Sequence, residues 1–182
     1  MDLAQILVSR LRAWGICQPE NRPGVYAYAL AAPRDLIPSS GERLIVYVGM
    51  TAQTLAERCH IDHEHSGRST LRRSLGALLR DELKLTPQPR AFGPSRSNTT
   101  NYRFDPDGEA RLTAWMKAYL LYADFPLTRD LHTTERDLIR DLEPPLNLRK
   151  WANPHRGVTE ALRAACAQDA RLWLLATEPV HV

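Results

Sequence analysis

Apolar and polar residues alternate along the chain in blocks that predict several strands. Two runs rich in Val, Ile and Tyr, Gly24 to Leu30 and Arg43 to Met50, are bounded by Pro, Ser and Gly and predict adjacent strands. The segment between them, Ala31 to Glu42, contains Pro, Ser and Gly residues that favour a loop. Further along, Leu121 to Leu127 predicts another strand and Asn101 to Phe104 a short one.

Other segments repeat their apolar residues every three or four positions, as an amphipathic helix does. They predict helices over residues 2–14 and 55–65, from Ser69 or Thr70, from Asp105, and over 134–142 and 159–176. The last helix is expected to turn one stripe inward, formed by Leu162, Ala165, Cys166, Leu172 and Trp173. Residues 86–101 read as a polar loop. The pattern is that of an α/β (α+β) fold, a small sheet with helices packed on it.

Composition agrees with one domain of ordinary size. The chain has 182 residues, of which 43% are hydrophobic and 25% charged, as in soluble globular proteins. It has no run of eighteen apolar residues and no signal peptide at the N-terminus, so no membrane association is expected. Three cysteines far apart in sequence favour buried thiols in a reducing compartment over a disulfide framework or a zinc site. A cytoplasmic protein is therefore expected.

The basic residues are almost all arginine. The net charge is only +3, but all except three of the 24 basic residues are Arg, whose planar fork matches phosphate oxygens. A GC-rich genome would produce the same bias. Local clusters are more informative: a set on and around the predicted second helix and the loop after it could contact phosphates of nucleic acid, namely Arg68, Arg72, Arg73, Arg90 and Arg96. For each of these, a solvated surface position is the alternative.

Glu135 stands at the edge of an apolar helix face. Positions 135, 138, 139 and 142 share one face of a helix, and the last three are Leu, Ile and Leu. A carboxylate buried there would have to be paired or bound to a metal ion. The alternative is that its side chain simply reaches water.

Each of the two predicted adjacent strands carries a tyrosine near a glycine. Tyr26 follows Gly24, and Tyr47 precedes Gly49, while Arg58 lies on the helix that follows. Two phenols and a guanidinium near a sheet edge suit phosphate chemistry, since a phenol can orient a water. Both tyrosines could equally be ordinary half-buried strand residues.

These motifs together resemble the GIY-YIG nuclease superfamily over roughly residues 23–148. The resemblance rests on Gly24-Val25-Tyr26, on Tyr47-Val48-Gly49, on Arg58, and on the stretch from Glu135 to Asn147, which occur in the family's order. The two tyrosine motifs are farther apart than is usual in the family. The resemblance implies a small, mainly antiparallel three-stranded sheet flanked by helices. Outside it, the helical patterns predict an added N-terminal helix (1–20) and a C-terminal helical extension (149–182).

The resemblance also implies a function: an endonuclease that hydrolyses phosphodiester bonds in nucleic acid, with DNA the expected substrate. In that case Glu135 would hold Mg²⁺, for which Mn²⁺ could substitute, and Arg58 would stabilise charge on the scissile phosphate. Tyr26 would activate or position the attacking water, with Tyr47 beside it. A neighbouring cation would have to favour its phenolate form. A nucleic-acid-binding module of the same fold that cleaves poorly is the second interpretation, and the sequence does not indicate the oligomeric state.

Three further positions complete the expected site. Gly49 would allow close approach of nucleic acid, and Asn147 would be either a positioning or phosphate-contacting group or a turn residue. The family histidine that follows the helix arginine has no direct counterpart, because the matching position is Asp62. The nearby His63 and His65 are the candidates, with surface imidazoles as the alternative.

Overall fold

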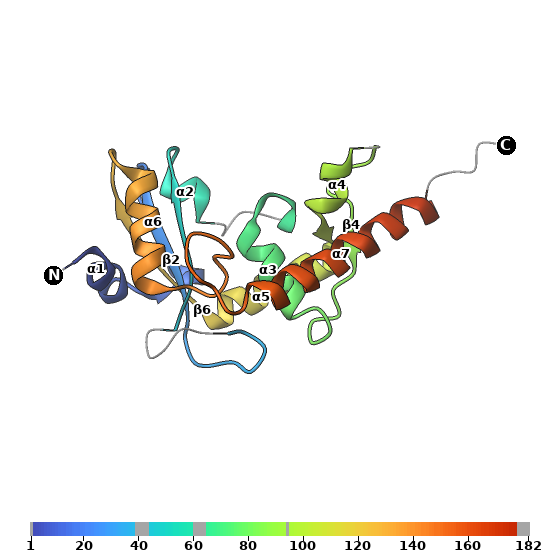
Figure 1. Ribbon diagram of the computed structural model, residues 1–182, viewed down its shortest axis with the longest axis horizontal. Coiled ribbons are helices and arrows are strands. Elements are labelled where there is room, and N and C mark those ends of the chain that lie inside the picture. The colour runs from blue at the N-terminus through green and yellow to red at the C-terminus, as the bar shows by residue number, and fades with distance from the viewer. Residues whose placement is uncertain (1, 39–43, 60–64, 94, 178–182) are drawn as a thin grey trace. The chain divides into compact units, whose positions relative to one another are not determined.

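The computed structural model describes residues 2–38, 44–59, 65–93 and 95–177 (Figure 1). It divides into two compact units. The first, here called the sheet unit, comprises Met1–Asp62 and Ala114–Arg156. The second unit comprises His63–Thr113 and Gly157–Val182.

The sheet unit is built on a four-stranded antiparallel sheet in the order β1-β6-β2-β3. Its strands are β1 (Arg12–Ala13), β2 (Gly24–Leu30), β3 (Ile45–Thr51) and β6 (Leu120–Pro126). The antiparallel sheet flanked by helices confirms the expected fold class, with one short strand more than expected. The extra strand replaces the end of the predicted first helix: α1 spans only Leu3–Ser9, since Arg12 and Ala13 pair with β6 and Trp14 is fully buried in η1 (Trp14–Ile16).

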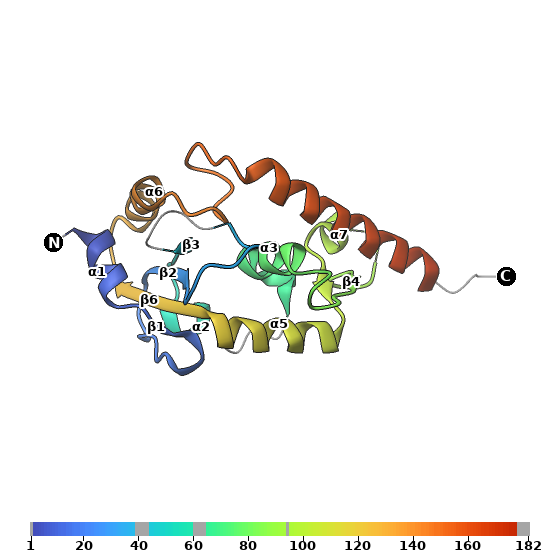
Figure 2. The ribbon, with the colours of Figure 1, turned by 90° about the horizontal axis from the view of Figure 1, so that it is seen from below.

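The central strand β2 is buried on both faces. Because successive side chains of a strand point to opposite faces, the two faces carry different kinds of residue. Val25, Ala27 and Ala29 share a core with α1 and with α6 (Leu131–Leu142), which contributes Leu138, Ile139 and Leu142. Figures 1 and 2 show both helices beside the sheet. The opposite face of β2 carries tyrosines, so the helices secure one side of the strand while the other side remains for polar chemistry.

The helix α2 (Leu55–Arg58) forms the first four residues of the helix predicted over 55–65. Thr54 caps its N-terminus: the Thr54 hydroxyl accepts from the Glu57 backbone N–H, and the Glu57 carboxylate accepts from the Thr54 N–H. The described part of the helix ends at Arg58. Residues 60–64 lie outside the described residues.

The second unit is mainly helical. Its elements are η3 (Ser66–Arg68), α3 (Thr70–Leu78), β4 (Pro87–Gln88), α4 (Arg96–Thr100), β5 (Arg103–Phe104) and α7 (Arg156–Thr177), and α5 (Pro106–Tyr119) contributes to both units. Ser69 caps α3 as predicted. The predicted loop over 86–101 is wrong in part, because β4 pairs with β5 and α4 forms within it. The backbone hydrogen bonds of β4 are made to β5, and a pairing of this kind cannot be predicted from the local composition of the loop.

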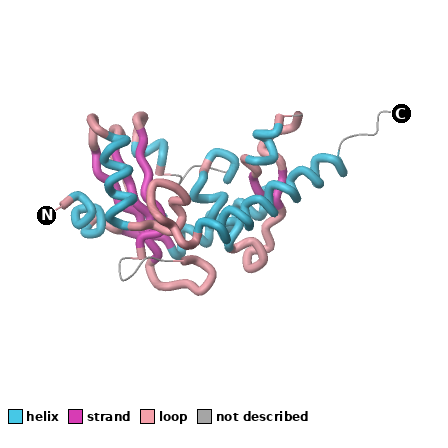
Figure 3. The backbone as a smooth tube through the Cα atoms, viewed as in Figure 1, coloured by secondary structure: helices cyan, strands magenta, loops and turns pink. Residues whose placement is uncertain are grey.

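The last helix, α7, is one continuous helix in Figure 3, and it buries only part of the face that was predicted to lie inward. Its buried residues are Thr159, Cys166 and Ala170, whereas Leu162 and Leu172 are 37% and 56% exposed. The prediction is confirmed for Cys166 but wrong for the large apolar side chains. The other buried positions are held by the small residues Thr159 and Ala170, which let a helix pack closely. None of the helices within the described ranges is long and apolar enough to cross a membrane.

Candidate active site

Tyr26 lies across the neighbouring strand, over Gly49. The two residues are paired in the β2–β3 register, and Tyr26 is only 1% exposed. A Cβ atom added to Gly49 would come within 2.5 Å of both Cζ and the hydroxyl oxygen of Tyr26. Glycine is therefore needed at position 49 to make room for the Tyr26 ring, which joins the two tyrosine motifs into one feature.

Arg58 reaches this phenol from the end of α2. Its Nε–H donates to the Tyr26 hydroxyl oxygen over 3.2 Å. Burial raises the pKa of Tyr26, and this effect outweighs the opposing influence of the Arg58 charge. Tyr26 in this structure is therefore a neutral phenol, whose oxygen accepts from Arg58. The charge of Arg58 favours the phenolate form, as expected, but by itself it does not offset the effect of burial on the pKa of Tyr26.

More tyrosines surround Tyr26 on the same face. The ring centroids of Tyr47 and Tyr122 lie 6.4 Å and 6.2 Å from that of Tyr26. Tyr47 thus lies beside Tyr26 as the sequence indicated, while the contribution of Tyr122 from β6 was missed.

The carbonyl of Cys59, directly after Arg58, is held by two buried donors. The Trp14 Nε1–H donates to it over 2.7 Å, and the Tyr28 hydroxyl donates to the same oxygen. The Cys59 thiol lies 3.2 Å from that of Cys17. Sequence separation hid this network, which fixes the backbone at the point where Arg58 leaves α2.

Glu135 lies on the first half of α6 with its side chain only 13% exposed. Its Oε2 accepts from the Lys150 Nζ over 2.5 Å, a partner that the sequence analysis did not identify. The pKa of Tyr26 is raised mainly by burial, and the negative charge of Glu135 raises it further. The two side chains therefore interact electrostatically. Glu135 is thus paired, as its position on an apolar face required.

Glu135, as a single carboxylate ligand, suits a hard cation such as Mg²⁺ rather than a metal site in which the protein supplies every ligand. Within the described residues no group of three or more His, Cys, Asp or Glu side chains could hold an ion. Glu135 offers a carboxylate whose Oε1 accepts no hydrogen bond from the residues that the structure describes. A single carboxylate completed by waters and substrate oxygens is a usual arrangement for Mg²⁺.

Asn147 holds the outer edge of β3. Its Oδ1 accepts from the Val48 N–H and its Nδ2 donates to the Val48 carbonyl, both over 2.8 Å. The Leu146 N–H also donates to the Val46 carbonyl over 2.9 Å. Asn147 therefore takes the place of a neighbouring strand, between Tyr47 and Gly49, and acts as a positioning residue.

The predicted arginine patch divides when its members are placed in the second unit. Arg68 and Arg96 are exposed and Arg90 is half-buried, but Arg72 and Arg73 are buried. Arg72 forms an ion pair with Glu109 over 2.8 Å, and Arg73 donates to the backbone carbonyls of Ser66 and Gly67. The expectation that Arg72 and Arg73 face solvent is wrong. Glu109, which is remote in sequence, draws in the guanidinium of Arg72, and the turn just before α3 holds that of Arg73.

Of the two candidate histidines, the structure describes only His65. His65 belongs to the second unit, where it lines a pocket with Glu109. His63 lies outside the described residues.

A partly buried ion pair between β6 and β1 was also missed. Asp124 is paired in register with Tyr26 and is 4% exposed, and its Oδ1 accepts from Arg12 over 3.2 Å. The apolar content of this segment marked it as a strand but gave no signal that the Asp124 carboxylate is buried. Arg12 on β1 supplies the counter-charge.

Comparison with known families gives a direct result. The family model of the GIY-YIG catalytic domain matches residues 30–166, about three quarters of the chain. The match begins at the end of β2, so the assignment of Tyr26 rests on the motif and on the geometry described above. Searches of curated proteins and of solved structures gave no significant match. The chain belongs to the GIY-YIG catalytic domain family, whose function is of the nuclease type, with nucleic acid as the substrate.

Proposed function

We propose that this protein is a Mg²⁺-dependent endonuclease that hydrolyses phosphodiester bonds, with DNA as its substrate. The observation that carries the proposal is the hydrogen bond between Arg58 and the buried Tyr26, in the same unit as the carboxylate of Glu135. These are the three groups that phosphodiester hydrolysis needs: a cation for the phosphate, a group that positions water, and a ligand for the metal.

Arg58 and Tyr26 have separate tasks in this scheme. The Nε–H of Arg58 is engaged by the phenol, so the terminal nitrogens of the guanidinium are those that meet the phosphate oxygens. Tyr26, a neutral phenol, orients the attacking water by hydrogen bonding. Its raised pKa makes proton abstraction by a phenolate unfavourable in the arrangement described.

Glu135 would hold the metal ion, with Oε1 as the first donor. Bound Mg²⁺ supplies charge neutralisation at the phosphate and the leaving oxygen. Lys150 competes for the same carboxylate through Oε2, so we expect metal binding to weaken or displace this ion pair. Mn²⁺ would fit the same oxygen donor.

The Lys150–Glu135 ion pair also favours the second candidate function. A lysine that occupied the carboxylate permanently would leave a nucleic-acid-binding module with little cleavage. The two functions differ in one measurable respect, because only the nuclease should respond to divalent cations.

The deciding experiment is cleavage of labelled single-stranded, duplex and forked DNA and of RNA, with Mg²⁺, with Mn²⁺ or with EDTA. Wild-type protein should cleave DNA with either metal and not with EDTA. Glu135→Gln should lose about a hundredfold or more in rate while binding is kept, because charge neutralisation is lost. Asp141→Asn, which changes an exposed carboxylate on the same helix, is the matched control and should remain active.

Lys150→Met tests the competition directly. If Lys150 holds Glu135 against the metal, its removal should lower the Mg²⁺ concentration needed for half-maximal cleavage. Undiminished cleavage by Glu135→Gln would contradict the metal-ligand role, and binding without cleavage by the wild type under every metal condition would establish the binding module instead.

A further inference from the structure

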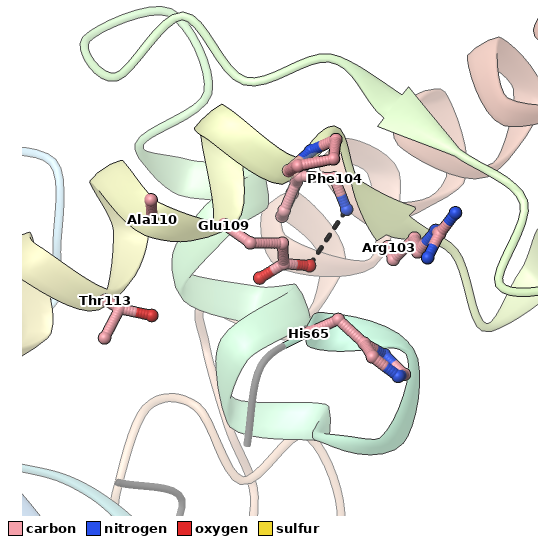
Figure 4. A pocket seen from close by; sticks show the side chains of 7 residues that line it. His65, Arg103, Phe104, Glu109, Ala110 and Thr113 are labelled. Atoms are coloured by element: carbon pink, nitrogen blue, oxygen red, sulfur yellow. Dashed lines mark hydrogen bonds between the residues drawn. The ribbon is translucent and has the colours of Figure 1, made fainter. Parts of the chain in front are cut away.

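The second unit contains a pocket of its own, with a volume of about 340 Å³ (Figure 4). It is lined by His65, Arg103, Phe104, Pro106, Glu109, Ala110 and Thr113. Apolar side chains therefore form part of its wall, while basic and hydroxyl groups provide hydrogen-bond donors. None of these residues belongs to the sheet-unit site.

The carboxylate of Glu109 in this wall is already satisfied. Glu109 accepts from the N–H and the hydroxyl of Ser66 over 2.6 Å and 3.0 Å, and from the Phe104 N–H over 3.0 Å. Arg72 neutralises it through a 2.8 Å ion pair. Glu109 thus adds no unpaired negative charge, and the net charge of the pocket comes from its other residues.

Two cationic or potentially cationic side chains remain incompletely bonded. His65 Nδ1 and Arg103 Nε are buried and have no hydrogen-bond partner among the described residues. Figure 4 shows the His65 ring and the Arg103 guanidinium extending to the same side, away from Glu109. Buried polar nitrogens without partners are costly, and a ligand that accepts hydrogen bonds would remove that cost.

Other positive charges lie close to His65. Burial lowers the pKa of His65, and the charges of Arg103 and Arg68 add to this effect against the opposing pull of Glu109. The side chain of Arg90 passes beside Gly67, where an added Cβ would meet Arg90 Cγ at 2.7 Å and His65 Nδ1 at 3.1 Å. Several basic groups therefore converge on one imidazole, the arrangement expected of an anion site.

We propose that this pocket binds a backbone phosphate of the nucleic acid, held by Arg103 and His65, which extend to the same side in Figure 4. The apolar wall of Phe104, Pro106 and Ala110 suits the sugar attached to that phosphate. The inference rests on the proposed function and gives the second unit a role in substrate binding that is separate from cleavage.

The first test is the salt dependence of binding to a labelled oligonucleotide in EDTA, where cleavage is blocked. Loss of one phosphate contact in Arg103→Gln should reduce the slope of log affinity against log salt by about one. Arg163→Gln, which changes a basic residue on α7 away from the pocket lining, is the control and should keep the wild-type slope. A thermal melt of each variant checks that the unit stays folded.

The second test uses unmodified protein. The ring-proton resonances of His65, assigned with His65→Gln, are followed during titration with inorganic phosphate and, separately, with the oligonucleotide. A bound phosphate should raise the pKa of His65, since it favours the imidazolium. We expect this rise with the oligonucleotide.

The outcomes separate this inference from the proposed function. A response to inorganic phosphate alone would make the pocket a site for a free anion and overturn the nucleic-acid contact, and no response to either ligand would overturn the site altogether. Cleavage of DNA with an unchanged slope in Arg103→Gln would refute the pocket while leaving the nuclease intact. A protein that binds no nucleic acid would refute both.

Discussion

Removing one oxygen atom from Tyr26 separates its chemistry from its packing. Tyr26→Phe keeps the ring across Gly49 and deletes only the hydroxyl that accepts from Arg58. Tyr122→Phe is the matched control, because Tyr122 is also fully buried and stacks on Tyr26 at an interplanar angle of 25°. The Tyr122 hydroxyl has no hydrogen-bond partner among the described residues, so its deletion removes nothing that the site uses.

The expected magnitudes follow from these contacts. Tyr26→Phe loses the hydrogen bond from Arg58 and leaves the Arg58 Nε–H without this acceptor, which should lower the free energy of unfolding by about 1 kcal/mol. For a chain of this size, that corresponds to a fall of about 2–4 °C in melting temperature. Loss of a water-positioning group should reduce the rate of cleavage by about a hundredfold or more. Tyr122→Phe should leave the rate near the wild-type value and the stability unchanged or slightly raised.

The assay is single-turnover cleavage of the preferred substrate in saturating Mg²⁺, with a thermal melt of each protein. Full activity of Tyr26→Phe would remove the phenol from the chemistry. An equal loss of rate in Tyr122→Phe would show that any disturbance of the tyrosine cluster suffices, which would also refute the reasoning. Tyr28→Phe is unsuitable as a control, because the Tyr28 hydroxyl holds the carbonyl next to Arg58.

Three further predictions follow from other parts of the structure. Asn147→Ala removes two hydrogen bonds from the Val48 backbone and should lower the free energy of unfolding by about 2 kcal/mol or more in urea denaturation; an unchanged midpoint would contradict the strand-like role of Asn147. Burial raises the pKa values of Tyr26, Tyr28, Tyr102 and Tyr122, so their contribution to stability is complete below pH about 10 and is lost as the pH rises further. Ultraviolet titration should therefore show these phenols ionising together with unfolding, and gradual ionisation in the folded protein would count against their burial. A mild thiol oxidant such as diamide should form a disulfide between Cys17 and Cys59, whose sulfurs are 3.2 Å apart, and leave Cys166 reduced. Peptide mass mapping would detect this disulfide, and its absence from oxidised folded protein would contradict the observed proximity.

Local signals predicted the elements that depend on local causes. The strand β2 occupies the predicted residues, because its Val and Tyr content and its flanking Pro and Gly act within a few positions. Ser69 caps α3 for the same kind of reason. The two-residue strand β1 was not predictable, since it exists only through pairing with β6, more than a hundred residues away.

The candidate site shows the same division. The tyrosines and Arg58 were identified by motif, and their relation to one another follows from the β2–β3 register. Arg72 looked like a surface residue because its counter-ion, Glu109, comes from a different helix. Lys150 could not be connected to Glu135 from the sequence, because the turn after the two prolines decides where the chain returns to α6.

The contact between Gly49 and Tyr26 also limits how this chain can change by mutation. A side chain at position 49 would occupy the space of the phenol. A substitution there would therefore displace Tyr26, although it changes no atom of Tyr26 itself. The two positions are epistatic: Gly49→Ala should be severe when Tyr26 is present and nearly neutral once position 26 carries a small residue. Mutational scans of this domain would then report a loss at Gly49 whose cause lies on the adjacent strand.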